Sequence, residues 1–330
     1  MFVHTPTLRR RPAPANTSSQ TSTPSASGYK RWIVGVTAAL GLLALTYLMI
    51  CGYMALTLTK TDKQPLLESP EQYGLSYESM TFRSRVDAMR LDGWLLEPPT
   101  GTAQRRPIVV VHGWKSDRTR EANHHMLAIA AQLVRRGYPT LLFDLRGSGL
   151  SAGDRFTLGV QEVRDVGGAV DFLNQRGLAS DGVDLLSYSM GGATALLDAP
   201  GEPLVRAVAE DSGYADLQNL LDTEVPKFSG LPGFFTPGLV FAARPIVGGD
   251  LYALRPIDGV PTLAAHSVPL LVIHGRADDF IDVENGYRIA AAYGSNVQTF
   301  YVPGAGHVRS YEVDPTTYIA RLIAFFDGVS

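Results

Sequence analysis

Six short apolar runs alternate with helical patterns after residue 106, and this alternation constrains the fold more than any other feature of the sequence. The runs are continuous, as in strands whose two faces are both buried in a parallel sheet. They occupy residues 107–111, 139–143, 183–186, 204–209, 269–273 and 297–302. Helical patterns occupy residues 122–136, 160–175, 191–197, 283–293 and 316–326. The sequence therefore predicts an α/β fold with a doubly wound, mostly parallel sheet.

Two further segments complete the predicted domain, which covers residues 77–330. Residues 77–85 and 89–96 alternate between apolar and polar side chains, as the strands of an antiparallel hairpin do. Residues 212–265 contain several prolines and an apolar set that includes Phe234 and Phe235. Because this stretch is too long for an ordinary connection, we expect it to form a small lid insertion.

The 28 residues from 32 to 59 carry no charged side chain. A helix of about 20 apolar residues spans the hydrocarbon core of a bilayer, which is about 30 Å thick. Trp32, Tyr47 and Tyr53 lie near the ends of the run, as expected for side chains at a membrane interface. Five basic residues and no acidic residue precede it, which favours a cytoplasmic N-terminus. We interpret residues 32–57 as a single-pass transmembrane signal anchor of the cell membrane, with the following domain extracytoplasmic.

Residues 1–31 and 58–76 flank this predicted anchor. The first segment is rich in Ser, Thr and Pro and is predicted to be a disordered cytoplasmic tail, and the second a linker. A cleaved signal peptide is the main alternative, but its apolar region extends only about 7–15 residues. A lipoprotein site at Cys51 would need a small residue where Ile50 stands. A buried core helix rarely extends this far without a charged side chain.

Composition excludes several classes of partner and site. The net charge of −3 gives no basic surface of the kind that binds nucleic acid. A single cysteine and seven scattered histidines offer neither a disulfide nor the spacing of a zinc site. Residues 147–152 match a Gly-rich dinucleotide motif, but no helical pattern begins inside it, as binding would require. We therefore expect no nucleic acid, no metal and no nucleotide cofactor.

The segment Ser187-Tyr188-Ser189-Met190-Gly191 lies between an apolar strand and a helical pattern. In that context it is a nucleophile elbow, a strained turn that projects a serine oxygen out of the sheet. Small residues two before and two after the nucleophile let strand and helix approach each other. Ser187 stands where glycine is usual, but its side chain is short. The pattern predicts Ser189 as a nucleophile.

Other landmarks follow in order: His112-Gly113-Trp114, the segment 144–151, His274-Gly275-Arg276-Ala277-Asp278 and Gly304-Ala305-Gly306-His307. With these motifs the chain resembles the α/β-hydrolase fold superfamily, in particular its serine esterase, lipase and serine peptidase branches. The resemblance implies Ser189 as nucleophile, Asp278 as acid and His307 as base. Asp211 and Asp279 remain alternatives for the acid. The resemblance also implies an oxyanion hole formed by the backbone N–H groups of Met190 and Trp114.

These residues predict a membrane-anchored serine hydrolase that forms an acyl-enzyme and acts on a small-molecule carboxylic ester. The same triad could cleave a peptide, another amide or a thioester, so these substrates stay open. A catalytically silent binding module would be expected to lack Ser189 or His307. We expect Tyr188, Phe234 and Phe235 to contact the substrate, and the predicted chemistry needs no cofactor.

Overall fold

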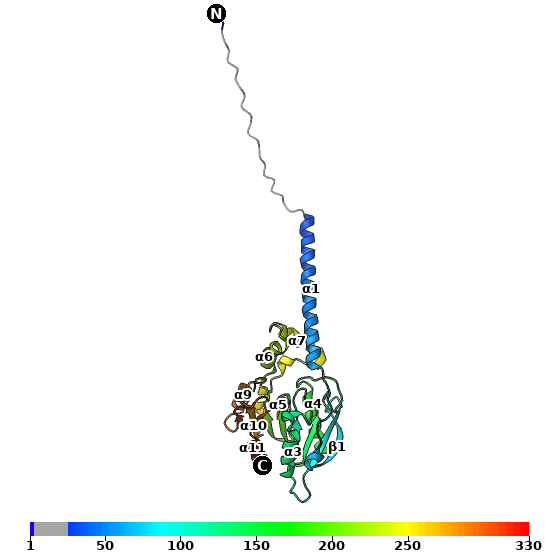
Figure 1. The fold of residues 1–330 in the computed structure, drawn as a ribbon, viewed down its shortest axis with the longest axis vertical. Helices are drawn as coiled ribbons and strands as arrows, with labels where there is room; N and C mark the ends of the chain where they lie inside the picture. Colours follow the sequence, from blue (N-terminus) through cyan, green and yellow to red (C-terminus); the bar gives the residue numbers. More distant parts are fainter. Residues whose placement is uncertain (3–25, 330) are drawn as a thin grey trace. The chain divides into compact units, whose positions relative to one another are not determined.

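The structure is a computed structural model that describes residues 1–2 and 26–329 (Figure 1). The chain divides into two compact units, Met1–Thr46 and Tyr47–Ser330. Most of the predicted tail, residues 3–25, lies outside the described residues. The predicted linker 58–76 lies within the second unit and is hydrogen-bonded to other parts of it. The backbone N–H of Thr61 donates to the carbonyl of Asp154 at 3.2 Å, and that of Leu67 donates to Thr119 Oγ1 at 3.1 Å.

Helix α1 (Ala26–Thr59) contains the predicted anchor. Its stretch Gly28–Thr59 is long and apolar enough to cross a membrane, a property that signal anchors and signal sequences share. In the first unit its side chains from residue 28 to 46 are exposed. In the second unit Cys51, Ala55 and Thr59 are fully buried, at the four-residue spacing of one helix face. The end of α1 therefore belongs to the core of the second unit.

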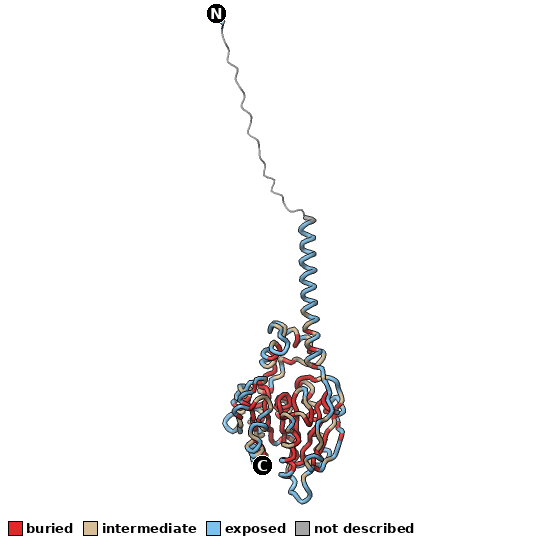
Figure 2. The backbone as a smooth tube through the Cα atoms, viewed as in Figure 1, coloured by how far each residue is buried: buried red, intermediate tan, exposed pale blue. Residues whose placement is uncertain are grey.

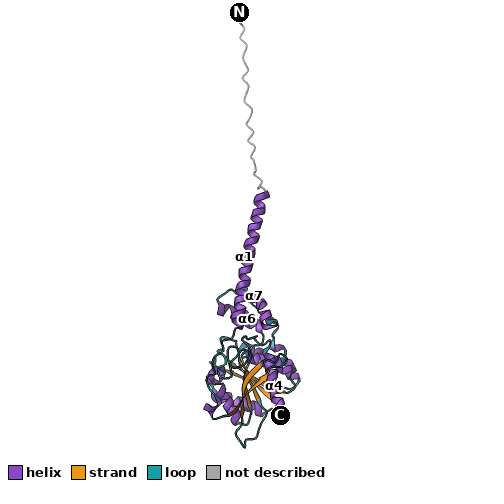
Figure 3. Cartoon of the chain, turned by 90° about the vertical axis from the view of Figure 1, so that its right-hand side faces the viewer, coloured by secondary structure: helices purple, strands orange, loops and turns teal. Residues whose placement is uncertain are grey.

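An eight-stranded sheet has the order β1-β2-β4-β3-β5-β6-β7-β8. Figure 3 shows its strands in orange, with helices around them. The strands are β1 (Ser76–Arg83), β2 (Arg90–Glu97), β3 (Ile108–Val111), β4 (Thr140–Asp144), β5 (Val183–Tyr188), β6 (Val205–Asp211), β7 (Leu270–Gly275) and β8 (Gln298–Val302). Strands β1 and β2 form the predicted antiparallel hairpin, and β2 is antiparallel to β4. From β4 to β8 all neighbours are parallel. The predicted mostly parallel α/β sheet is confirmed.

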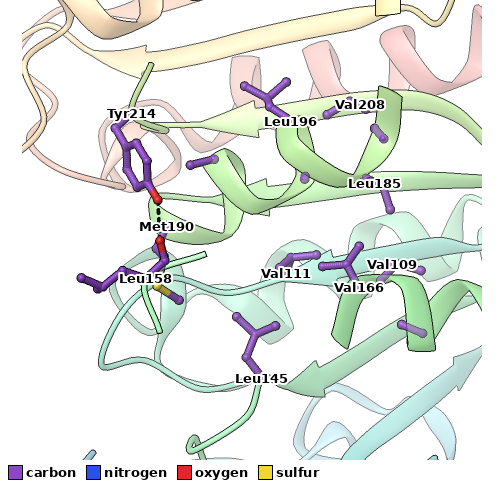
Figure 4. Packing of buried hydrophobic residues seen from close by; sticks show 14 of the residues in the cluster. Val109, Val111, Leu145, Leu158, Val166, Leu185, Met190, Leu196, Val208 and Tyr214 are labelled. Atoms are coloured by element: carbon purple, nitrogen blue, oxygen red, sulfur yellow. Dashed lines mark hydrogen bonds between the residues drawn. The ribbon is translucent and has the colours of Figure 1, made fainter. Parts of the chain in front are cut away.

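Helices cover both faces of this sheet because successive strand side chains point to opposite sides. Val109 and Val111 share one core cluster with Val166 of α4 (Glu162–Gln175) and Leu196 of α5 (Met190–Asp198) (Figure 4), and α9 (Glu284–Tyr293) contacts β7. Val110 packs with α3 (Met126–Arg135) and α11 (Pro315–Asp327) on the other face. Figure 2 shows the buried backbone concentrated in the strands of this unit. The short elements are η1 (Pro70–Tyr73), α2 (Glu121–His124), η2 (Ala199–Gly201) and α10 (Ser310–Val313).

The helix predicted over residues 122–136 is wrong in its first turn. Ala122, Asn123 and His124 have φ angles of 51°, 50° and 69°. Three successive left-handed residues cannot continue into a right-handed helix. The regular helix therefore begins only at Met126, in α3.

The predicted lid segment is helical. It contains α6 (Leu217–Ser229), α7 (Phe235–Val247), η3 (Leu251–Ala253), η4 (Pro256–Asp258) and α8 (Val260–Ala265). Asp216 caps α6 by accepting from the backbone N–H of Asn219 at 3.2 Å, and Gly230 ends the helix with a φ of 68°. Helices α6 and α7 contact each other, as Figure 1 also shows.

Helix α7 packs against the part of α1 that lies in the second unit. The Tyr47 hydroxyl donates to the carbonyl of Phe234 at 2.9 Å, and the Tyr47 ring stacks on Phe235 at 5.1 Å. A Cβ atom at Gly238 would lie only 2.5 Å from Cys51 Sγ. Gly238 therefore allows the two helices to approach closely.

Candidate active site

Ser189 lies on a sharp turn between β5 and α5. Its φ of 53° and ψ of −123° are unusual for a residue with a side chain, and such strain is concentrated at functional sites. A Cβ atom at Gly191 would lie 2.4 Å from the carbonyl oxygen of Val111, so glycine is needed where helix and sheet meet. The Ser187 hydroxyl donates to the carbonyl of Ala209 at 3.1 Å. The small polar side chain at 187 is thus accommodated in place of glycine.

His307 lies in the loop that follows β8, and its ring bridges two of the predicted site residues. Its Nε2 is 2.8 Å from Ser189 Oγ, and its Nδ1 is 2.7 Å from Asp278 Oδ2. The ring of Phe280 meets the His307 ring edge to face, with centroids 4.9 Å apart. The loops after β5, β7 and β8 therefore bring Ser189, Asp278 and His307 together in one hydrogen-bonded chain.

Asp278 is buried and well supplied with donors. Its Oδ1 accepts from the backbone N–H groups of Phe280 at 3.0 Å and Ile281 at 2.8 Å. Burial alone would raise the pKa of Asp278, but hydrogen bonds from His274 and His307 outweigh it and hold that pKa well below its usual range. The carboxylate consequently stays ionised at neutral pH. A negative charge against Nδ1 favours the tautomer in which Nε2 is free to accept a proton.

The alternative acids occupy different places. Asp279 is exposed to solvent. Asp211 is buried, and its Oδ1 accepts from the hydroxyls of Ser212 at 3.0 Å and Ser310 at 3.3 Å. Its backbone carbonyl accepts from the N–H of Ser189 at 2.8 Å. The Asp211 carbonyl thus holds the backbone at Ser189, while the carboxylate that accepts from His307 is that of Asp278.

The loop that contains Gly113 and Trp114 lies directly against Ser189. A Cβ atom at Gly113 would be 2.9 Å from Ser189 Cβ, and the Gly113 N–H donates to the buried carboxylate of Glu121. His112 Nε2 accepts from the backbone N–H of Leu145 at 3.0 Å, which fixes the other side of this loop. The sequence did not single out Glu121, because one acidic residue at a short helix start has no distinctive pattern.

The two predicted oxyanion donors lie on the wall of the cavity that holds Ser189. Met190 is the first residue of α5, so its N–H has no acceptor within the helix. Trp114 follows Gly113 in the loop that touches Ser189. A developing oxyanion requires N–H groups aimed at one point, so the role of Met190 and Trp114 as donors stays a prediction.

A cavity of about 850 Å³ opens beside Ser189. This volume lies within the range of about 300–1,000 Å³ that is usual for ligand pockets. Most of its wall is apolar and comes from α1, α6 and the loops around the site. The residues include Met49, Tyr53, Met54, Leu58, Leu158, Leu217, Leu221, Val225, Phe228, Leu231, Leu239 and Phe280. The cavity can therefore accept a ligand with a large apolar group.

The three predicted substrate contacts are not on this wall. Tyr188 is fully buried on the other side of the sheet, with its hydroxyl 3.3 Å from that of Tyr318. Phe234 is 63% exposed, and Phe235 stacks on it and on Tyr47. Strand alternation turns Tyr188 away from the cavity. Two aromatic residues of the predicted lid segment do line it, Tyr214 and Phe228.

Among the residues that the structure describes, no three His, Cys, Asp or Glu side chains gather as ligands of a metal ion would. Asp144 and Asp165 each accept hydrogen bonds from a buried arginine. Asp144 accepts from the guanidinium of Arg118 at 2.6 Å, and Asp165 from that of Arg146 at 2.6 Å. Both carboxylates hold loops in place, as buried and paired acids commonly do.

Comparison with known proteins extends these observations. The sequence is 24% identical over 242 residues to the uncharacterized protein YfhR of Escherichia coli strain K12, covering 72% of this chain and 75% of that protein. An esterase of Pyrococcus furiosus has the same fold, with a TM-score of 0.68 and 22% identity over 82% of this chain and 98% of that one. The acylaminoacyl peptidase of Pyrococcus horikoshii matches with a TM-score of 0.55 and 20% identity. The match covers 77% of this chain and 41% of that one.

The resemblance expected from the motifs is confirmed at the level of the family. Residues 108–321 match the family model described as the Alpha/beta hydrolase family. This match spans the sheet from β3 onward, the elbow and the loops that carry Asp278 and His307. The chain belongs to the alpha/beta hydrolase family.

Proposed function

We propose that the protein is a serine hydrolase in which Ser189, His307 and Asp278 act together. The observation that carries this proposal is the chain of two hydrogen bonds, 2.8 Å and 2.7 Å long, from Ser189 through His307 to Asp278. A serine hydroxyl is a weak nucleophile at neutral pH, so a base must remove its proton as it attacks. His307 is within hydrogen-bonding reach of that proton.

The reaction proceeds in two halves. Ser189 Oγ bonds to the acyl carbon while its proton moves to His307 Nε2, and the carbonyl oxygen becomes an oxyanion beside the N–H groups of Met190 and Trp114. The C–O bond to the leaving group then breaks, and His307 protonates the departing alcohol. Water attacks the acyl-enzyme with His307 again as base, and the acid is released. One oxyanion donor contributes about 3–4 kcal/mol to such a step.

An ester is the favoured substrate because of the cavity next to Ser189. Its wall is largely apolar, so it matches an acyl group better than a peptide, whose amide groups need polar partners when buried. The structural neighbours include both an esterase and a peptidase, which keeps an amide substrate as the second candidate.

Substrate preference is tested with p-nitrophenyl esters of graded acyl length beside aminoacyl p-nitroanilides. We expect ester turnover and fluorophosphonate labelling, both lost in Ser189→Ala, whose residual rate should be orders of magnitude lower. A Ser189→Ala protein with more than about a tenth of wild-type activity would contradict the mechanism. A preference for anilides would favour the peptidase.

We also propose that residues 32–57 anchor the protein in the cell membrane, with the N-terminus cytoplasmic and the hydrolase domain outside. The charge-free run and the five basic residues before it support this orientation. The burial of Cys51 and Ala55 in the second unit argues against a cleaved signal peptide. Cleavage after the apolar run would remove these residues from a packed core.

A further inference from the structure

The end of α1 does more than attach the domain, because two neighbouring faces of it have different surroundings. Cys51, Ala55 and Thr59 are buried in the core of the second unit. The next face lines the cavity that contains Ser189, through Met49, Ile50, Tyr53, Met54, Thr57 and Leu58. These residues recur in pairs every four positions, as one stripe along a helix does. The stripe forms one wall of the candidate active site.

The depth of this stripe in a bilayer can be inferred from its distance along the helix to the last charged residues before the apolar run. The last charges before the apolar run are Lys30 and Arg31. About 20 residues from that point cover the hydrocarbon core of about 30 Å, so the core ends near Cys51. Met49 and Ile50 would then lie at the edge of the hydrocarbon, and Tyr53 in the headgroup layer. Membrane lipids carry their acyl ester bonds at this depth.

The lid presents aromatic side chains to solvent beside this part of α1. Phe228, Phe234 and Phe241 are 69%, 63% and 64% exposed. Aromatic residues are enriched at membrane interfaces, and exposed apolar groups of this size commonly mark a contact surface. Phe228 also lines the cavity and packs edge to face on Phe280, with centroids 5.6 Å apart. Phe280 in turn contacts His307.

We propose that the cavity is an acyl channel open to the bilayer, and that the substrate is a long-chain acyl ester resident in the membrane. The chain enters from the leaflet between α1 and α6, which both line the cavity, and brings its ester to Ser189 without passing through water. This inference rests on the proposed serine hydrolase and on the proposed anchor. It makes the anchor helix part of the substrate site.

The test uses the full chain reconstituted in phosphatidylcholine vesicles. One probe is p-nitrophenyl palmitate embedded in the same vesicles, and the other is water-soluble p-nitrophenyl butyrate. Met49→Trp puts a large side chain on the cavity wall, and Leu48→Trp is the matched control. The two positions are adjacent and 58% and 53% exposed, but Leu48 does not line the cavity.

We expect Met49→Trp to lower the ratio of palmitate to butyrate hydrolysis about tenfold, because the larger side chain narrows the apolar channel for the long acyl group. Leu48→Trp should leave the ratio within about twofold of wild type, since its side chain faces lipid. Fluorophosphonate labelling of Ser189 in each variant reports a folded site. Tyr53→Arg with Leu56→Arg as control repeats the comparison at a second pair of exposed positions.

Equal ratios in Met49→Trp, Leu48→Trp and the wild type would overturn the channel while leaving the serine hydrolase intact. So would a wild type that hydrolyses butyrate but not embedded palmitate. A wild type that is neither labelled nor active on either ester would instead contradict the proposed hydrolase, and the channel with it.

Discussion

His274 Nε2 lies 3.4 Å from Asp278 Oδ2, the same oxygen that His307 approaches at 2.7 Å. The carbonyl of Ile281 lies 2.7 Å from that Nε2 and can only accept, so the proton of His274 resides on Nε2. Two imidazoles and two backbone N–H groups thus surround one carboxylate. Burial alone would lower the pKa of His274, but the interactions with Asp278 and Glu210 outweigh burial, so the pKa lies above its usual value. His274 is therefore a positioning residue for Asp278.

Three Asp→Asn substitutions separate the candidate acids. Asp278→Asn keeps the shape of the side chain but favours the wrong tautomer of His307, at a cost of up to about 10⁴-fold in kcat by analogy with serine proteases. Asp279→Asn should cost far less, because Asp279 is exposed. Asp211→Asn should fall between, because the Asp211 carboxylate accepts from the hydroxyls of Ser212 and Ser310 close to the site but does not contact the His307 ring.

All three variants are assayed with one ester, after their melting temperatures are shown to match the wild type. A nearly normal rate in Asp278→Asn beside an inactive Asp211→Asn would assign the role of the acid to Asp211 on β6. That result would contradict the proposed role of Asp278.

Gly113→Ala tests the contact between the loop and the nucleophile. The added Cβ would meet Ser189 Cβ at 2.9 Å, so the loop or the serine must shift. Displacing a reacting group by about 1 Å can cost on the order of 10²-fold in rate. Gly306→Ala is the control, because its Cβ meets nothing closer than 3.7 Å. Similar kcat/KM losses in both variants would show that the Gly113 contact has no special role.

The triad could be predicted from the sequence because each member has a local motif at the end of a strand. The cavity wall could not. Residues 32–59 are apolar around the whole helix, so no periodicity distinguishes the face of Cys51 and Ala55 from the face of Met49 and Tyr53. Tertiary contacts select these faces, among them the packing of α7 on α1 at Gly238 and the bond from the Phe156 N–H to the carbonyl of Thr59.

The structure differs from the sequence-based predictions at two other places, Tyr188 and the first turn of the predicted helix 122–136. The alternation of β5 places Tyr188 and Ser189 on different sides, but it does not reveal which side holds the cavity. Ala122, Asn123 and His124 adopt left-handed angles with no glycine or proline to mark the break. Next to this turn, the Glu121 carboxylate accepts from the backbone N–H of Gly113. Helix propensity depends on local sequence, so it cannot predict a break that accompanies such a tertiary contact.

Topology is tested with an N-terminal and a C-terminal epitope tag on the same chain. We expect protease added to intact cells, after removal of any outer barrier, to destroy the C-terminal tag and spare the N-terminal one. The protein should keep its N-terminal tag during maturation, because Cys51 and Ala55 are core residues. Loss of the N-terminal tag from the mature protein would instead indicate a cleaved signal peptide.

Glu210 is fully buried on β6, and burial raises its pKa to about 7. His274 and the N–H of Gly213, which donates to Glu210 at 2.7 Å, oppose this rise only in part. The unfolded carboxyl titrates near its ordinary value of about 4.3. Between these values the folded state binds a proton that the unfolded state does not. Stability contributed by this group is therefore present below about pH 4 and is lost as the pH rises toward 7.

Glu210→Gln removes this titration while keeping an oxygen that can accept from Gly213. We expect the free energy of unfolding in detergent to fall, between pH 4.5 and 7, by about 2–3 kcal/mol more in the wild type than in the variant. Asp278 does not contribute in this window, because its lowered pKa costs stability only below about pH 4. Parallel pH profiles for wild type and Glu210→Gln would mean that Glu210 is already ionised in the folded protein, with His274 as its counterion.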